Sequence, residues 1–262
     1  MVRLETARTR IRVAKPVLSA SKSRTVQNKI LLGLPTKERD AIFSKSEFVS
    51  LPTPKVLNEA EGHIKSVFFI NDGLASVLKI MEDGRSIEVG LCGREGFVGL
   101  PIVAGFSTSP TRVVMQVGGS GFRISAKDFL ATLQECPILG VRLRRFAHEL
   151  ALQAEQIAAC NRLHEVDQRL ARWLLMCQDR LGGNVVPLTQ TFLAHILGTR
   201  RASVTDAEGI LQRLGLISCS RGRVTIERRE GLEDAACECY GVLTQQIEKW
   251  QQEVSGEIER TG

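Results

Sequence analysis

The stretch "VPLTQTFLAHILGTRRASVTDAEGILQRLGLISCSRGRVTIERR", residues 186–229, decides how the C-terminal part of this chain folds. Two apolar patterns of helical period flank Gly198, a natural end for the first helix. The first helix carries four apolar residues on one side: Phe192, Leu193, Ile196 and Leu197. The second, from residue 200 or 201 to 214, turns inward Val204, Ala207, Ile210, Leu211 and Leu214. Two short helices joined by a tight turn that contains glycine form a helix-turn-helix.

The polar residues of this stretch indicate a nucleic-acid partner. The inward set leaves exposed, near the start of the second helix, the positions that reach base edges in a major groove: Arg201, Ala202, Thr205 and Asp206. Past Gly215, "LISCSRGRVTI" predicts a hairpin, or wing, whose Arg221 and Arg223 can approach phosphates. Helical hairpins with a glycine turn also occur in proteins that never bind DNA. The exposed arginine pair, the wing and an N-cap threonine, Thr189, together favour DNA.

Composition sets wider bounds. The chain has 262 residues, of which 43% are hydrophobic and 24% charged, as in a globular protein of about two domains. A net charge of +6 fits a polyanionic partner, although a basic enzyme would show the same charge. Seven scattered cysteines without a CxxC pair indicate reduced thiols in a cytoplasm. No apolar run is long enough to cross a bilayer.

The first 27 residues are strongly basic, with seven Lys and Arg against Glu5 alone. They lack the apolar core of a secretory signal. Their composition is similar to that of an organelle transit peptide, but a disordered basic arm is the preferred interpretation, because so little of it can be buried.

Residues 56–124 show short β-rich runs broken by turn signals. Asn71-Asp72-Gly73 and Glu82-Asp83-Gly84 separate apolar runs, as in hairpins, and residues 118–121 form a third glycine-rich break. Strands at this spacing predict a β-barrel or jelly roll, here called the β-roll. One or two short helices are expected just before it, within residues 29–51.

From Pro137 the apolar period changes to that of a helix. Apolar residues follow one another at steps of four and three, with Gln153 filling the gap: Leu139, Leu143, Phe146, Leu150, Ile157 and Cys160. This seam of roughly three heptads predicts a dimer helix whose interface comprises all of these positions except Cys160, with Leu143, Phe146 and Leu150 at its centre. An amphipathic helix lying on its own β-roll is the alternative. A second helix, residues 166–181, is expected to end at Gly182.

Together these features resemble the Crp/Fnr family of bacterial transcription regulators. The resemblance covers residues 29–229 and is most specific in "LTQTFLAHILGTRRASVTDAEGILQRLGLI". It implies an α+β fold with a cyclic-nucleotide-binding-like β-roll, a long dimerisation helix and a winged helix-turn-helix. The expected divisions are a basic arm (1–27), the β-roll (28–136), the dimerisation helix (137–164), the DNA-binding module (165–230) and a helical extension (231–262).

The resemblance also implies roles for residues of the module. Arg201 stands at the family's guanine-reading arginine, whereas Ala202 and Asp206 differ from the family's other readers, so the family's best-known half-site is not expected. The residues expected to hold the phosphates are Thr189, Gln190, Arg200, Ser203, Arg221 and Arg223. The expected partners are double-stranded DNA and a second copy of the chain, with RNA polymerase a further candidate.

The stretches that match the family's nucleotide cassette are degenerate. Gly99 is kept, but Leu100 replaces the ribose acceptor, and Pro110-Thr111 stands where the cyclic phosphate needs a cation. Arg112 lies close, but not at the matching place. The effector is therefore expected not to be cyclic AMP. No cysteine precedes Cys92, which argues against the family's N-terminal iron–sulfur cluster.

No catalytic, metal or cofactor site is expected. Cys237-Glu238-Cys239 offers too few ligands for a cluster, so buried or idle thiols are predicted there. The four histidines stand beside no nucleophile in a known motif. Two alternatives remain: a ligand-sensing β-roll whose helix-turn-helix makes protein contacts and, less favoured, a basic enzyme. The sequence leaves open the effector, the operator, the target genes, the direction of regulation and the roles of both terminal segments.

Overall fold

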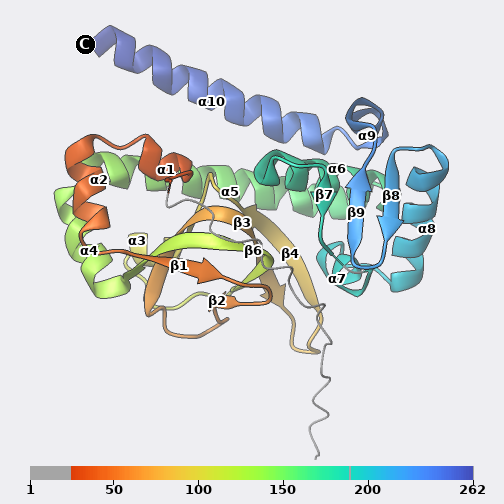
Figure 1. The fold of residues 1–262 in the computed structure, drawn as a ribbon, viewed down its shortest axis with the longest axis horizontal. Coiled ribbons are helices and arrows are strands. Elements are labelled where there is room, and N and C mark those ends of the chain that lie inside the picture. The colour runs from red at the N-terminus through yellow and green to blue at the C-terminus, as the bar shows by residue number, and fades with distance from the viewer. Residues whose placement is uncertain (1–24, 189, 262) are drawn as a thin grey trace, which may run out of the picture.

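The structure, a computed structural model, describes residues 25–188 and 190–261. Most of the expected basic arm, and the expected phosphate contact Thr189, therefore lie outside the described residues. The chain builds the β-roll first, then a long helix, then the helix-turn-helix module and a last long helix (Figure 1). Among the helices that the structure describes, none is both long enough and apolar enough to span a membrane.

The β-roll is an antiparallel sheet with short helices at its margins. The strand order is β1-β6-β3-β4, with β2 paired to β6 and β5 to β3. Its elements are α1 (Lys29–Leu32), α2 (Thr36–Phe43), β1 (Glu47–Leu51), β2 (Val56–Asn58), β3 (Ser66–Ile80), β4 (Ser86–Cys92), β5 (Phe97–Val98), α3 (Leu100–Val103), β6 (Arg112–Ser125) and α4 (Ala126–Glu135). The predicted helices before the roll are thus α1 and α2. The turn predicted at Glu82-Asp83-Gly84 joins β3 to β4, and Gly84 has a φ of 81°.

Two predicted chain breaks are wrong. Asn71-Asp72-Gly73 lies inside β3 and residues 118–121 lie inside β6, and these two strands pair along almost their full length. The glycines serve a β-bulge instead of turns: the register shifts around Asp72, and Gly73 has a φ of 89°. A Cβ on Gly119 would stand 2.0 Å from the carbonyl oxygen of Asp72. Only glycine allows the two backbones to approach so closely.

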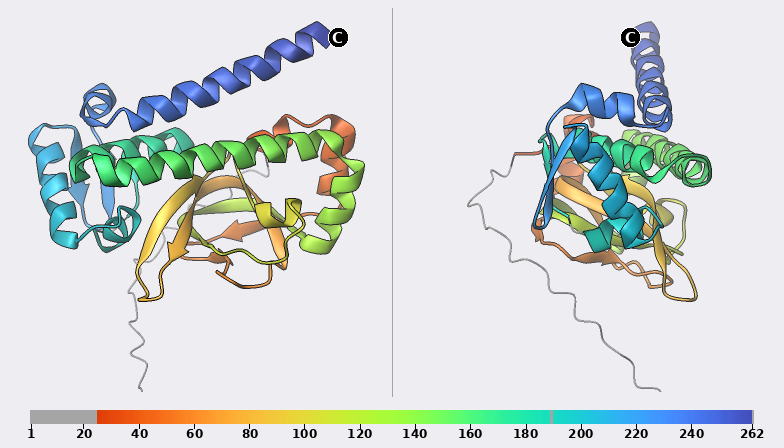
Figure 2. Two further views of the ribbon diagram at one scale, coloured as in Figure 1. Left: turned by 180° about the vertical axis from the view of Figure 1, so that it is seen from behind. Right: turned by 90° about the vertical axis from the view of Figure 1, so that its right-hand side faces the viewer.

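Helix α5 (Pro137–Leu163) lies across the top of the roll and reaches the module (Figures 1 and 2). Leu139, Leu143 and Phe146 are buried in the core of their own roll. Ile157 is buried as well, while Leu150 is half-buried beside Gly90 of β4. A side chain without exposed surface in one chain has none to offer a second copy. The dimer interface predicted at Leu139, Leu143 and Phe146 is therefore corrected, because these residues pack on their own roll. Of the other two predicted interface residues, Ile157 is buried and Leu150 keeps part of its surface exposed.

The module follows as α6 (Val166–Leu181), β7 (Val185–Val186), α7 (Gln190–Ile196), α8 (Arg201–Arg213), β8 (Ile217–Ser220), β9 (Arg223–Ile226) and α9 (Arg229–Ala235). Its strands pair antiparallel in the order β7-β9-β8. Gly182, with a φ of 70°, ends α6 as predicted. Helix α10 (Cys239–Thr261) then turns back above α5, where Trp250 meets His148 with ring centroids 4.8 Å apart (Figure 1).

The module and the roll share one hydrophobic core. Leu74 of β3 and Leu91 of β4 are buried together with the apolar side of α6, including Trp173. The indole nitrogen of Trp173 donates a 2.8 Å hydrogen bond to the carboxylate of Glu88 on β4. This buried polar contact fixes the position of α6 on the roll, because neither group could leave its partner without losing a buried hydrogen bond.

Burial raises the pKa of Glu88 from about 4.5 in an open chain to about 7 in the folded protein. The stability that this group contributes is therefore fully present below about pH 4.5 and is lost as the pH rises through about 7. Glu88→Gln keeps the acceptor oxygen for Trp173 and carries no charge. We expect the free energy of unfolding of the variant to exceed that of the native protein increasingly between pH 5 and pH 8, by on the order of 1–3 kcal/mol at the upper end. Urea titrations at each pH measure this difference, and parallel pH profiles would contradict it.

Candidate nucleic-acid interface

The turn between α7 and α8 is fixed by hydrogen bonds and by the roll. Gly198 has a φ of 58°, and the amides of Gly198 and Thr199 donate to carbonyl groups of α7. The guanidinium of the buried Arg169 on α6 donates to the carbonyl of Leu197. A Cβ on Gly198 would lie 2.6 Å from the end of the Ile87 side chain on β4. The positive φ therefore favours glycine at this turn, and a Cβ here would also displace the end of the Ile87 side chain.

Helix α8 divides into a buried and an exposed face. Val204, Ala207 and Leu211 are buried in the shared core, whereas Leu214, which was expected to face inward, is exposed at the end of the helix. The four predicted base-reading residues all lie on the exposed side: Arg201, Ala202, Thr205 and Asp206. The Thr205 hydroxyl donates to the carbonyl of Arg201 at 3.1 Å.

The wing forms as the sequence predicts. Strands β8 and β9 pair from Ile217 opposite Ile226 to Ser220 opposite Arg223, leaving Arg221 and Gly222 as a two-residue turn. Gly222 has a φ of 79°, which suits such a turn. Its carbonyl accepts a 3.0 Å hydrogen bond from the amide of Leu188. The tip of the wing therefore lies beside the segment that leads into α7.

The arginines of this surface differ from several others in the chain. Arg112, Arg123 and Arg229 pair with carboxylates at 2.6–2.8 Å. Within residues 25–188 and 190–261, no ion pair or side-chain hydrogen bond engages the four exposed arginines expected to contact DNA: Arg200, Arg201, Arg221 and Arg223. Exposed guanidinium groups without an internal carboxylate are available to phosphates or base edges.

Two other predicted phosphate contacts, Gln190 and Ser203, are uncharged, the first exposed and the second half-buried. The side-chain amide of Gln190 donates to the buried carboxylate of Glu208 on α8 at 2.6 Å, so it links α7 to α8. Ser203 is half-buried on α8. The basic set is therefore formed most directly by Arg200, Arg221 and Arg223.

The residues at the degenerate cassette positions pack on the core of the roll or make contacts at its surface. Gly99, with a φ of 126°, precedes α3, and Leu100 packs on the core of the roll. Pro110 is exposed, and the Thr111 hydroxyl lies 2.9 Å from that of Ser109. Arg112 donates to Glu59 at 2.8 Å on the surface. The charge of Arg112 is thus compensated by Glu59.

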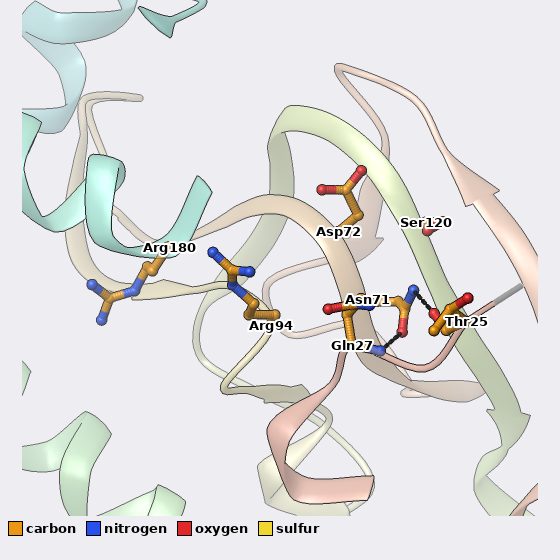
Figure 3. A pocket seen from close by; sticks show the side chains of 7 residues that line it. All are labelled: Thr25, Gln27, Asn71, Asp72, Arg94, Ser120 and Arg180. Carbon is orange, nitrogen blue, oxygen red and sulfur yellow. Dashed lines mark hydrogen bonds between the residues drawn. The ribbon is translucent and has the colours of Figure 1, made fainter. Parts of the chain in front are cut away.

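A pocket of about 300 Å³ lies at a different place, between the start of the roll and the end of α6. Figure 3 shows its lining: Thr25, Gln27, Asn71, Asp72, Arg94, Ser120 and Arg180. The Asn71 side chain accepts from the amide of Gln27 and donates to the carbonyl of Thr25. Arg180 pairs with Glu95 at 2.7 Å. This polar pocket shares no residue with the cassette positions.

One cluster was missed from the sequence. Cys160 and His164, at the end of α5, meet Cys237 and Cys239, at the start of α10, with their ligand atoms all within 4.8 Å of one another. The sequence offered Cys237 and Cys239 alone, and folding places Cys160 and His164 beside these buried thiols. The ligands come from segments 77 positions apart, whose proximity depends on how the whole module folds.

Comparisons with known proteins agree with this geometry. Residues 168–235 match the family of Crp-like helix-turn-helix domains. No curated protein matches the sequence.

Three solved structures share the fold at low sequence identity. A transcriptional regulator of the Crp/Fnr family from Eubacterium rectale is 16% identical, with a TM-score of 0.61 over 80% of this chain and 98% of that chain. The c-di-GMP responsive global regulator CLP from Xanthomonas campestris is 16% identical, with a TM-score of 0.62 over 74% and 100%. FixK2 from Bradyrhizobium japonicum is 14% identical, with a TM-score of 0.63 over 73% and 98%.

The solved structures cover 73–80% of this chain, so their likeness extends over both the roll and the helix-turn-helix module. This chain carries a Crp-like helix-turn-helix domain at residues 168–235 and has the fold of the Crp/Fnr transcription regulators.

Proposed function

We propose that this protein is a cytoplasmic, sequence-specific DNA-binding transcription regulator that acts as a dimer on a pseudo-palindromic site. The single observation that carries the proposal is the exposed start of α8 together with the wing, where Arg201 and Arg221 form no ion pair with any residue that the structure describes. The match of residues 168–235 to Crp-like domains supports it. The alternative, a helix-turn-helix that makes only protein contacts, does not account for arginines gathered on this face.

The residues take two kinds of role. Arg201 reads a guanine in the major groove, assisted by Ala202, Thr205 and Asp206, whose side chains share its face. Arg200, Arg221 and Arg223 hold phosphates and set the register, as Thr189 also does in this proposal. Asp206 carries a negative charge, so it favours a cytosine amino group and disfavours close phosphates.

Alanine substitution of Arg201, the proposed base-reading residue, and of Arg221, a proposed phosphate contact, separates these two roles. Arg201→Ala should lower affinity for the selected site by roughly 5–150-fold, because a bidentate guanine contact contributes about 1–3 kcal/mol of discrimination, and should relax preference at one position per half-site. Arg221→Ala should weaken all sequences alike and reduce the salt dependence of binding. Selection from a random DNA pool, followed by titration at several salt concentrations, measures both effects.

Arg123→Ala is the matched control, since Arg123 is an exposed arginine of the roll that pairs with Glu47. It should leave binding unchanged. If native protein bound random duplex DNA without a steep fall in affinity with salt, the alternative of protein contacts alone would be favoured. If Arg201→Ala and Arg221→Ala gave the same uniform loss, the assignment of reader and positioner would be wrong.

The dimer proposed here uses the outward face of α5, because the inward face packs on the roll. Ala151, Glu155, Ala158 and Arg162 are exposed and recur at the spacing of one helical face. Small residues there allow a second α5 to approach closely. Helix α10 borders this face, through the contact between Trp250 and His148.

Ala151→Arg combined with Ala158→Arg should convert the dimer to a monomer, since bulky like charges from two chains would meet across the axis. Sedimentation velocity measures the mass, and operator binding should fall in the same variant. Ala131→Arg, at an exposed position of α4, is the control and should stay dimeric. A double variant that remained a dimer would place the interface elsewhere, with α10 the next candidate.

The effector proposed is not a cyclic nucleotide. Binding cyclic AMP or cyclic GMP requires a cation for the phosphate, and a buried phosphate left unpaired costs several kcal/mol. Leu100 packs on the roll core, Pro110 is exposed, and Arg112 is paired with Glu59.

Calorimetric titration of either nucleotide should therefore give no saturation at micromolar concentrations. One-site saturation that was lost in Arg112→Ala would show that this arginine leaves Glu59 to bind the phosphate, and would overturn the proposal. Saturation kept in Arg112→Ala would overturn it as well, with a different cation responsible. Glu59→Gln removes the ion pair of Arg112 and is a second test. We expect this variant to bind neither nucleotide, and binding by it would show that the released Arg112 can reach the cyclic phosphate.

A further inference from the structure

The cysteine and histidine cluster has the dimensions of a single-ion metal site. Cys160 Sγ lies 3.4 Å from Cys237 Sγ, and Cys239 Sγ lies 3.5 Å from His164 Nδ1. All four ligand atoms lie within 4.8 Å of one another. A tetrahedral Zn²⁺ with bonds of about 2.0–2.3 Å needs ligand atoms about 3.4–3.8 Å apart. Small side-chain adjustments would bring the four atoms to these separations.

The atoms around the cluster are those that orient ligands in metal sites. The second ring nitrogen of His164, Nε2, lies 3.0 Å from the Glu238 carboxylate. If Nε2–H donates to Glu238, the lone pair of Nδ1 points toward the thiols, as in the carboxylate–histidine–metal arrangement. The side-chain amide of Gln156 donates to Cys239 Sγ at 3.0 Å. Both contacts orient a ligand side chain of the cluster, His164 in one case and Cys239 in the other.

The burial of the cluster also fits a bound ion. Cys160, Cys237 and Cys239 are buried and form a separate small core of their own. Three thiolates and one divalent cation leave a single negative charge, and the buried Arg169 and Arg172 of α6 interact electrostatically with Cys160. These two cationic side chains offset the remaining negative charge of the site.

We propose that Cys160, His164, Cys237 and Cys239 bind one thiophilic divalent cation, Zn²⁺ in the reduced cell. Four protein ligands complete the tetrahedron, so the site is structural rather than catalytic. A disulfide between Cys160 and Cys237 is the competing chemistry. It would require the sulfurs to approach from 3.4 Å to about 2.05 Å and would remove two ligands.

The position of the site gives the ion a role in holding the module. Cys160 and His164 stand where α5 ends, just before α6 begins at Val166. Cys237 and Cys239 stand where α9 has ended and α10 begins. The module therefore enters and leaves at the same point. An ion there ties the long helix, the module and the C-terminal helix together and limits rotation of the module about the α5–α6 junction.

Cobalt substitution tests the proposal on the full chain. Protein purified under reducing conditions should contain one zinc per chain by elemental analysis. After removal of the metal, added Co²⁺ should bind one per chain and give the intense visible bands of tetrahedral cobalt with thiolate-to-metal charge transfer in the near ultraviolet. Zn²⁺ should displace the Co²⁺. Absence of both bands in reduced, folded protein would overturn the proposal, and so would iron with the absorption of an iron–sulfur cluster.

Variants locate the site. Cys237→Ser and His164→Gln should each weaken Co²⁺ binding by at least tenfold and change the visible bands. Glu238→Gln should keep all four ligands and the spectrum but weaken affinity, because it alters only the partner of the histidine. Cys219→Ser is the control, since this half-buried thiol of the wing lies outside the cluster. A loss of binding in Cys219→Ser equal to that in Cys237→Ser would overturn the assignment.

Thermal unfolding of the native protein supplies a test that does not depend on whether the variants can be expressed. Chelation of the native protein should lower the melting temperature, because the ion binds the folded chain alone, and Zn²⁺ should restore it. In Cys219→Ser the same shift should appear. Counting the free thiols of metal-free protein distinguishes the metal site from the disulfide. If two thiols were missing and no metal was bound, even after purification under reducing conditions, a Cys160–Cys237 disulfide would be present in place of the metal site, and the proposal would be overturned. Neither result depends on DNA binding, so this test and that of the proposed function can fail separately.

Discussion

The rest of the structure depends on the burial of α6 on all of its sides. Residues 169–177 are buried without interruption, because the roll covers one side of the helix and the module covers the other. Two of these residues are arginines, Arg169 and Arg172, and one is Trp173, so burial requires polar partners as well as apolar ones. The carbonyl of Leu197 and the carboxylate of Glu88 supply two of them.

This constraint places the proposed DNA-binding face. With α6 fixed on the roll, α7 is held against β4 through Gly198 and Ile87, and α8 must turn its polar side outward. The hydrogen bond from Gln190, at the start of α7, to the buried Glu208, in the middle of α8, links the two helices. Within residues 25–188 and 190–261, no carboxylate pairs with the exposed arginines of this face. The exposure of these arginines follows from the packing of the apolar side of α8 in the shared core.

The same constraint makes the two ends of the module meet. Because α6 starts beside the end of α5, and α9 packs back on α6, the chain returns to its point of entry before α10 begins. The buried thiols of Cys160 and Cys237 are brought together there, and Arg229 joins the same region by pairing with Asp179 of α6 at 2.8 Å. A C-terminal extension that had no evident role in the sequence therefore contributes two of four ligands to the proposed metal site.

Local sequence determined the elements whose side chains interact within a few residues. The helix-turn-helix followed from two apolar faces and Gly198, the wing from Arg221-Gly222 between β-rich runs, and the end of α6 from Gly182. Each rests on backbone geometry that a glycine or a helical period sets without help from distant residues. The resemblance to a known family extended these local features to the order of the whole chain.

Only the tertiary structure decided which surfaces meet. An apolar seam on α5 is the same pattern whether it faces a partner or its own roll, and Leu139, Leu143 and Phe146 prove to face the roll. The glycines at 73 and 119 signal a turn or a bulge equally well, until two strands pair across them. Cys237-Glu238-Cys239 supplies too few ligands until folding adds Cys160 and His164. In all three cases the sequence determines what a residue can do, whereas contacts between distant segments determine what it does, because the energy of packing depends on both partners.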